Sequence, residues 1–250
     1  MTINELNDYL INLFEADKRE SFPGEFGLTI KGRPTVNRVG YATNLTMETI
    51  EAAEKNNVDL ILTHHDAWEL IFGLKEVCTK RLTELGISHF FAHALLDDAD
   101  FGTNVALMER LGATVIEKSN PYQGLLYAGR VGEFIEPIPF TDLVKRVETL
   151  LEEPVRSWQN RPGPVQKLCV VTGGGFMTDE IHDAVERGCD TYITGEKMLY
   201  SIEYAAFAGI NLIVGSHTFT EVFGVENLAQ KVGSAFPSLE IVRLPESHIE

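Results

Sequence analysis

Short apolar runs alternate along the chain with segments whose apolar residues recur every three or four positions. Leu6, Leu10, Ile11 and Phe14 have this helical spacing and predict an amphipathic helix at the start of the sequence. Short apolar runs between turn signals are typical of buried strands. The predicted strands are 28–30, 36–42, 59–64, 87–92, 127–134, 167–172, 191–194, 211–214 and 239–244. The further predicted helices are 46–57, 74–85, 103–111, 141–151, 177–187, 200–208 and 217–233.

This alternation of strands and helices predicts an α/β fold with largely parallel, layered sheets. Six prolines lie between Ser119 and Gln166, where we expect a boundary between structural units. We therefore predict one α/β subdomain made of residues 1–120 together with 210–250, and a second made of residues 121–209.

The composition is acidic. Of the 250 residues, 44% are hydrophobic, which is ample for a core, and the formal net charge is -16. A surface that binds nucleic-acid phosphates would be basic, so we expect no nucleic-acid partner, and the acidity suits a cytoplasmic location. No apolar run approaches the roughly 20 residues that cross a bilayer. Cys78, Cys169 and Cys189 lack CxxC spacing and predict neither disulfides nor a thiolate zinc site.

Two adjacent histidines, His64 and His65, end the predicted strand that begins at Asp59. Ligands in open α/β sheets gather beyond the carboxyl ends of the strands, which is where these imidazoles lie. Imidazole is the commonest protein metal ligand, and neighbouring side chains at a strand end diverge, so the pair can serve two adjacent ions. A solvent-exposed pair in a loop is the alternative interpretation.

Two later segments also place polar side chains after predicted strands. His93 and Asp97 follow the strand 87–92, and the strand 211–214 is followed by His217 and Glu221. Residues four apart project from one helix face, so His217 and Glu221 could reach a common ion. A hydrogen bond on the surface is the alternative for this pair.

Other polar and glycine-rich positions have structural interpretations. Asn44 is a plausible cap for the helix 46–57. Asp98 and Asp100 are interpreted as helix-start and turn residues, because acidic side chains suit the N-terminal end of a helix dipole. The glycines 173–175 match no phosphate-binding motif, which favours a tight turn with a close backbone approach. Glu196 is either a pocket carboxylate or the start of the following helix.

The strand ends together offer three imidazoles and two carboxylates. These five residues are His64, His65, Asp97, His217 and Glu221. The set is too large for one catalytic ion that keeps a position open to water, and it suits two ions that share a bridging carboxylate. Nitrogen and oxygen donors favour Fe, Zn, Mn, Co or Ni over Cu(I) or an all-oxygen calcium site.

Four ordered blocks, which extend over nearly the whole chain, carry a resemblance to a known family. The blocks are Asp59–His65, His93–Asp97 with Asn104–Gly112, Val171–Gly175 with Tyr192–Glu196, and Gly215–Glu221 with Gly224–Val225. In order and spacing they resemble the GTP cyclohydrolase I type 2 / NIF-three-like family. Asp66 and Tyr200 depart from the family pattern, which usually has Pro or Gly at the first position and in many members His at the second.

The resemblance implies two interlinked α/β subdomains and a dinuclear centre of divalent metal ions held by the five residues named above. Asp97 or Glu221 would be the bridging carboxylate, and His93 resembles a residue near the site rather than a primary ligand. The resemblance also implies a homohexamer, a ring-shaped dimer of trimers whose metal sites face an internal cavity.

The activity that the resemblance implies is metal-dependent hydrolysis, with water attacking C8 of the guanine ring of GTP and formate being released. His93 and Glu196 are the candidate catalytic residues for proton transfer. Hydrolysis of a phosphoester at the same ions is a related alternative. A non-catalytic, metal-binding regulatory protein is the alternative from another class. The expected partners are a small-molecule substrate such as a nucleotide and further copies of the chain, with no membrane.

Overall fold

The computed structural model describes residues 1–250, which divide into two compact units. The first unit comprises Met1–Ala99 and Val225–Ile249, and the second comprises Asp100–Gly224 with Glu250. The boundaries predicted at residues 120 and 210 fall inside β5 (Thr114–Tyr122) and directly before β10 (Asn211–Val214), both of which belong to the second unit.

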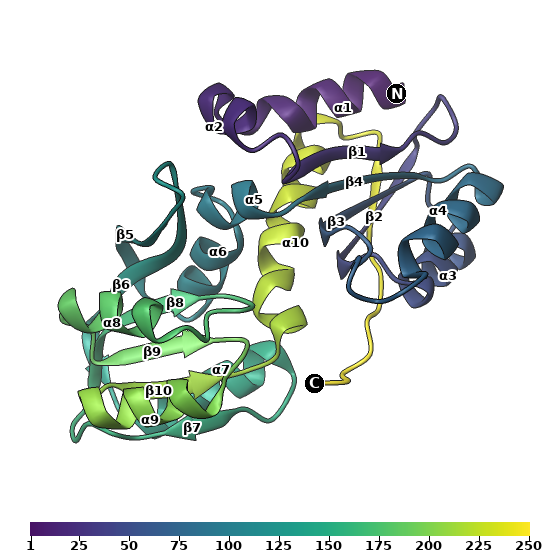
Figure 1. The fold of residues 1–250 in the computed structure, drawn as a ribbon. Coiled ribbons are helices and arrows are strands. Elements are labelled where there is room, and N and C mark those ends of the chain that lie inside the picture. Colours follow the sequence, from purple (N-terminus) through teal and green to yellow (C-terminus); the bar gives the residue numbers. More distant parts are fainter. The chain divides into compact units, whose positions relative to one another are not determined.

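Five strands form the sheet of the first unit in the order β1-β4-β3-β2-β11 (Figure 1). They are β1 (Phe26–Ile30), β2 (Arg38–Asn44), β3 (Leu60–His65), β4 (Ser88–Ala92) and β11 (Glu240–Arg243). All of these strands are parallel except the edge strand β1, which pairs antiparallel with β4. The helices are α1 (Ile3–Asn12), α2 (Ala16–Ser21), α3 (Met47–Lys55), α4 (Leu74–Leu85) and α5 (Ala94–Asp98).

Strand β3 is buried at all six of its positions, the first three of which are the apolar residues Leu60–Leu62. Helices α3 and α4 pack on the sheet through Ile50 and Leu82, which share a buried cluster with Ile61 of β3. A parallel strand in the middle of such a sheet is typically a continuous apolar run, and Leu60–Leu62 fit this pattern. Helix α4 ends at Gly86, whose φ of 65° is a left-handed conformation that glycine adopts without strain.

Six strands form the sheet of the second unit in the order β5-β6-β8-β9-β10-β7 (Figure 1). The remaining strands are β6 (Leu126–Ile138), β7 (Arg156–Trp158), β8 (Val165–Val171) and β9 (Thr191–Thr194). Only β8, β9 and β10 are mutually parallel. The helices are α6 (Thr103–Arg110), α7 (Phe140–Leu151), α8 (Thr178–Glu186) and α9 (Leu199–Ala208), and α10 (His217–Ala235) runs from the second unit into the first.

Alternate residues of β8 supply two apolar clusters, one on each face of the second sheet. Leu168 and Val170 belong to the cluster that includes residues of α6, α7 and α10. Cys169 and Val171 belong to the cluster formed with α8 and α9. This period of two is that of a strand covered on both faces. Cys169 is thus a core residue, and all three cysteines are free.

The mixed α/β class is confirmed, with several local corrections. The prediction of largely parallel sheets is wrong for the second unit, where β5, β6 and β7 make antiparallel pairs. The strand β5 was not among the predicted elements, because its alternating polar residues carry no apolar run. Asn44 does not cap α3; it ends β2, and the cap is Thr46, whose hydroxyl accepts from the Thr49 amide at 3.2 Å.

The interpretation of Asp98 as a helix-start residue is also wrong. Asp98 is the last residue of α5 and is 1% exposed, and its carboxylate lies 2.6 Å from Nζ of Lys18. A buried carboxylate needs such a partner, since desolvation of an isolated charge is very costly. Here the ion pair, and not the helix dipole, accounts for the acidic residue.

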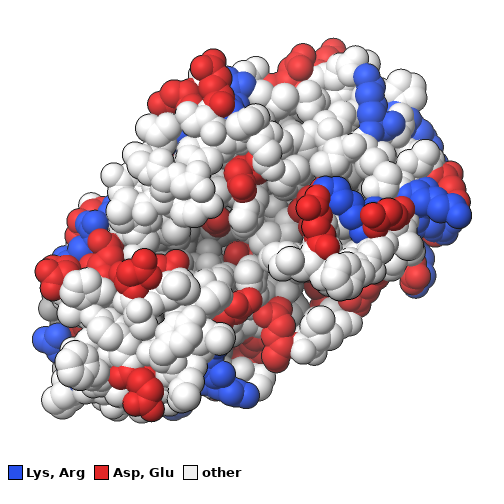
Figure 2. Space-filling model, viewed as in Figure 1, with Lys and Arg blue, Asp and Glu red and all other residues white.

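The charge of the surface agrees with the acidic composition. The chain has 37 acidic and 21 basic residues, not counting histidine, and Figure 2 shows Asp and Glu side chains scattered over the visible face, with Lys and Arg beside several of them. None of the helices is both long enough and apolar enough to span a bilayer.

Candidate metal centre

His64, at the carboxyl end of β3, is fully buried and held by the neighbouring strand. Its Nδ1 lies 2.8 Å from the carbonyl oxygen of Ala92 at the end of β4. A carbonyl can only accept a hydrogen bond, so Nδ1 carries the proton and Nε2 carries the lone pair. A metal-binding histidine is typically fixed in this way, with its other ring nitrogen donating to a carbonyl.

His65 is fixed by the amide side chain of Asn44. Oδ1 of Asn44 accepts from Nε1 of Trp68 at 3.2 Å, and Nδ2 of Asn44 donates to a carboxylate oxygen of Glu246 at 3.0 Å. These two contacts set the orientation of the amide, because the indole nitrogen only donates and a carboxylate only accepts. Nδ1 of His65, 2.9 Å from the same Oδ1, is therefore protonated, and Nε2 again carries the lone pair.

Helix α5 places a carboxylate beside this pair. Oδ1 of Asp97 lies 3.4 Å from Nε2 of His64, the nitrogen that carries the lone pair. His93 donates from Nδ1 to Glu25 at 2.6 Å, and this hydrogen bond lowers the pKa of the Glu25 carboxyl. His64, His65 and His93 each offer a ligand atom, and these atoms all lie within 4.8 Å of one another. The first unit thus gathers three imidazoles and one carboxylate.

The second unit contains a smaller group at the start of α10. Nε2 of His217 lies 3.4 Å from Oε1 of Glu221, one helical turn later, and Nδ1 of His217 lies 2.6 Å from Oε1 of Glu196. Glu196 is therefore a pocket carboxylate that orients the imidazole, which decides between the two interpretations of this residue. It lines a cavity of about 300 Å³ together with Arg156 and Lys197.

The two carboxylates control the charge of His217. Burial opposes the charged imidazole, but Glu221 and Glu196 outweigh it and raise the pKa of His217 to about 11. The hydrogen bond from His217 in turn lowers the pKa of Glu196. At neutral pH the metal-free imidazole is thus an imidazolium held between two carboxylates, and a metal ion at Nε2 would take the place of a proton.

Gly173 explains how the second group fits together. Its φ is +64°, and a Cβ built there would lie 2.0 Å from Oε1 of Glu221 and 2.9 Å from Nε2 of His217. Thr220 and Thr194 hydrogen bond to the amide and carbonyl of Gly173 and fix the turn. The tight turn with close backbone approach is therefore confirmed at this glycine, and the side chains that approach it are two of the predicted ligands.

Each unit thus brings together the predicted site residues that it contains. His64, His65, Asp97 and His93 are neighbours in the first unit, and His217, Glu221 and Glu196 in the second. Sequence reasoning missed the supporting residues Asn44, Glu246 and Glu25. The role of Asn44 could have been found from the strand register, because β2 pairs in parallel with β3 and sets Asn44 opposite His65.

A further buried histidine, His89 of β4, also supports the first group. Its Nε2 lies 2.8 Å from the hydroxyl of Thr63, which donates to the carbonyl of His65 at 2.7 Å. Since that hydroxyl proton is committed to the carbonyl, Nε2 of His89 is the donor, and Nδ1 accepts from Thr29 at 2.6 Å. Through Thr63, neutral His89 thereby holds the backbone of His65.

The fold and these donor groups define a two-unit α/β protein with imidazole and carboxylate side chains suited to divalent metals. The chain belongs to the Duf34/NIF3 (NGG1p interacting factor 3) family, whose sequence model matches residues 1–248. A relative from Pyrococcus horikoshii, named GTP cyclohydrolase 1 type 2 homolog, is 32% identical over 209 residues, covering 81% of this chain and 82% of its own. A relative of the same name from Pseudomonas aeruginosa is 30% identical, with 84% of each chain covered.

Solved structures share this fold. The protein TTHA1606 from Thermus thermophilus matches with a TM-score of 0.82 at 25% identity over 100% of both chains. A Bacillus cereus protein related to NIF3 matches with a TM-score of 0.75 at 17% identity, covering 98% of this chain and 97% of its own. The second likeness is one of fold alone.

Replacement of Gly173 by alanine tests the close packing around His217 and Glu221. Gly173→Ala should lower stability by more than the roughly 1–2 kcal/mol of left-handed strain, because its Cβ overlaps Oε1 of Glu221. It should also weaken metal binding, measured by calorimetric titration with Zn²⁺ or Mn²⁺. Gly188→Ala is the matched control, since Gly188 has a φ of +74° and open space around it. Equal effects of the two variants on metal binding would contradict this account.

His89 predicts a pH dependence of stability. Burial lowers its pKa from 6.5 to about 4, against the opposing effect of Asp66, whose carboxylate lies 3.8 Å away. Between these values the unfolded chain binds a proton that folded His89 excludes. Stability should therefore fall as the pH falls from 6.5 to 4, by on the order of 3 kcal/mol.

Chemical denaturation between pH 4.5 and 7.5 measures this dependence. His89→Gln should flatten the slope, because glutamine does not titrate, whereas His182→Gln, at an exposed histidine, should keep it. An unchanged slope in His89→Gln would show that other groups control acid stability.

Proposed function

We propose that His64, His65, Asp97, His217 and Glu221 together bind two divalent metal ions and that the protein is a metal-dependent hydrolase. The observation that carries the proposal is the common orientation of three histidines. Nδ1 of each donates to a fixed acceptor, namely Ala92 O, Asn44 Oδ1 or Glu196 Oε1, which commits Nε2 to coordination. Asp97 and Glu221 each lie 3.4 Å from one of these Nε2 atoms.

The donor chemistry supports Fe, Zn, Mn, Co or Ni, because imidazole and carboxylate suit these ions. When bound, two such ions acidify water and polarise the group that it attacks. Glu196 orients His217 by accepting a hydrogen bond from its Nδ1. His93 is the candidate for proton transfer, since its side chain is 44% exposed and Nδ1 donates to Glu25, which leaves Nε2 free to accept a proton.

The names of the relatives support GTP as the first substrate to test. The reaction that the family resemblance implies is opening of the guanine ring with release of formate. A phosphoester is the second substrate class for the same ions. The net charge of -16 favours a different alternative, a non-catalytic metal-binding regulatory protein, because such a field opposes a triphosphate.

Metal content and turnover test the proposal together. Wild-type protein loaded with Mn²⁺, Zn²⁺ or Fe²⁺ should contain two ions per chain by elemental analysis. His64→Ala and His217→Ala should each lower the content, and the double variant should neither bind metal nor release formate or phosphate from GTP. His182→Ala replaces an exposed histidine of α8 that hydrogen bonds to Tyr204, and it should retain both properties.

The outcomes separate the candidate functions. If each single variant loses one ion and keeps the other, each group binds its own ion and the shared centre is refuted. If the folded, fully loaded wild type releases neither product, the hydrolase is refuted and the regulatory alternative is supported.

A cytoplasmic location stays a prediction from the acidic charge.

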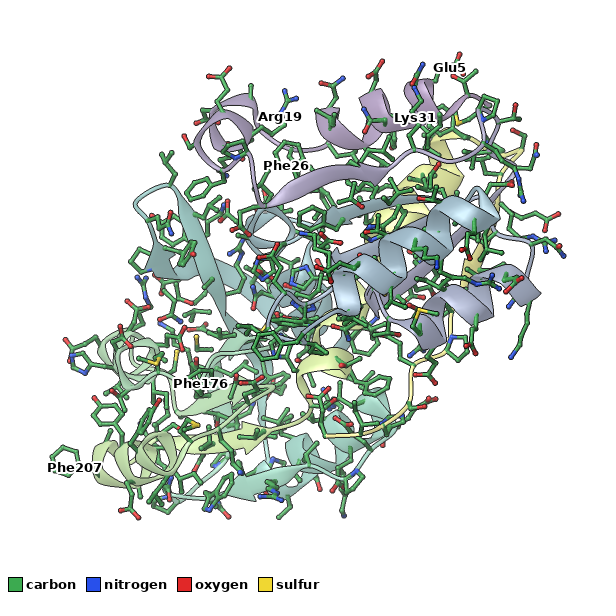
Figure 3. All side chains as sticks on the ribbon, turned by 45° about the vertical axis from the view of Figure 1, so that its right-hand side comes forward. Glu5, Arg19, Phe26, Lys31, Phe176 and Phe207 are labelled. Carbon is green, nitrogen blue, oxygen red and sulfur yellow. The ribbon has the colours of Figure 1, made fainter.

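We also propose that the chain assembles as a homohexamer. Large apolar side chains that are exposed on the surface support this assembly. Phe72 is 100% exposed and Leu70 84% exposed in the first unit, and Phe207 is 89% exposed in the second. Figure 3 shows Phe207 projecting outward from α9. Exposed apolar groups of this size commonly mark protein interfaces.

Light scattering after size-exclusion chromatography tests the assembly. The wild type should have six times the chain mass of 27.9 kDa. Phe72→Ser or Phe207→Ser should produce smaller species with unchanged thermal stability of the chain, because a polar replacement of an exposed residue costs little. Ile249→Ser, at an equally exposed position of 87%, is the control and should remain hexameric. A monomeric wild type at micromolar concentration would exclude the hexamer.

A further inference from the structure

We propose that a cavity beside His65 in the first unit binds a planar nitrogen heterocycle through its N–H donors and excludes a polyphosphate chain. The cavity has a volume of about 440 Å³, and we call it the Trp68 pocket; its walls include Phe26, Asp66, Trp68, Lys75, Phe91 and His93. The inference rests on the proposed function, because it names the class of substrate that the metal centre would act on.

Size and shape favour a small ring system. Ligand sites usually have volumes of about 300–1,000 Å³, with aromatic walls and a few fixed polar groups. Trp68 is a rigid wall, because its indole donates to Asn44 and its ring packs on His65 with the centroids 4.5 Å apart. Phe26, at the start of β1 (Figure 3), and Phe91 add flat apolar surface. A planar ring can stack on such walls.

The cations of the pocket are already matched by carboxylates. Nζ of Lys75 lies 3.2 Å from Asp66 and 2.7 Å from Glu69, and Nδ1 of His93 lies 2.6 Å from Glu25. All five of these residues line the pocket. Three carboxylates against one ammonium group and one imidazole leave no spare positive charge for a triphosphate, which is normally bound by several Lys or Arg side chains.

Asp66 is the residue that accepts hydrogen bonds from the N–H donors on the edge of the bound heterocycle. Its Oδ1 accepts from the Ala67 amide at 2.8 Å, and the contact with Lys75 holds Oδ2, so the carboxylate is fixed in place with 20% of the side chain exposed. A fixed carboxylate has lone pairs for two parallel N–H donors, such as N1–H and the 2-amino group of guanine. Asp66 is also one of the two positions where the chain departs from the pattern of the family that it resembles.

Fluorescence of Trp68 measures binding without metal or turnover. The chain has two tryptophans, so Trp158→Phe leaves Trp68 as the only one. In metal-free protein, guanosine should quench this fluorescence with a Kd at least tenfold lower than that of GTP. Inosine, which lacks the 2-amino donor, should bind about tenfold more weakly than guanosine.

Variants identify the group that reads the ring. Asp66→Asn in the same background should weaken guanosine binding to the level of inosine binding. It should leave inosine binding nearly unchanged, because the acceptor that the variant loses is the one for the 2-amino group, which inosine lacks. Glu69→Gln is the matched control: it removes another carboxylate partner of Lys75, is 78% exposed, and should change the Kd less than twofold. Thermal unfolding verifies that each variant is folded.

Three results would overturn the pocket assignment. They are GTP binding as tightly as guanosine, no quenching by guanosine, and equal affinities for guanosine and inosine in the wild type. None of the three needs an Asp66 variant, so they stand even if Asp66→Asn does not fold. Binding of guanosine by a protein that hydrolyses nothing would refute the hydrolase and leave the pocket intact.

Discussion

In His64, His65 and His217, one hydrogen bond from Nδ1 to a fixed acceptor controls which ring nitrogen would be available to a metal ion. The acceptors differ in charge: His64 and His65 donate to a neutral carbonyl and a neutral amide, whereas His217 donates to the carboxylate of Glu196. A charged acceptor makes the imidazole more basic. Under the proposed function a metal ion at His217 would have to displace a tightly held proton, because the two carboxylates raise the pKa of this imidazole to about 11.

These hydrogen bonds depend in turn on chain segments that lie far apart in sequence. Asn44 is held by Glu246, which also accepts from the amides of Thr43 and Asn44 at 2.7 and 2.9 Å. Glu246 reaches this position because β11 runs parallel to β2 and directs the following residues toward the end of that strand. The segment after the last strand thus contributes to the orientation of His65, a predicted metal ligand that lies 181 positions before Glu246 in the sequence.

The sequence predicted the features that depend on local pattern. Buried strands such as β9 and β10 and the helix α4, with Gly86 at its end, follow from apolar periodicity and match the structure residue for residue. The errors lie where tertiary partners decide. The sequence pattern predicts Asp98 as a helix-start residue, but its carboxylate is paired with Lys18. The pattern likewise predicts Asn44 as a helix cap, but the strand register sets it opposite His65. The strand β5 was not predicted, because it is a strand through its pairing with β6 and has no apolar run.

The acidic charge has opposite consequences for the two ligands that the proposed function requires. A chain with a net charge of -16 attracts divalent cations, and carboxylates such as Asp97 and Glu221 stand where those cations would be. The same field repels a triphosphate. The ammonium group of Lys75 in the Trp68 pocket is already paired with two carboxylates. Any phosphate bound here would therefore have to rely on the metal ions for its counter-charge. A ring that offers N–H donors needs no such compensation, because its donors match the carboxylates that are already in place.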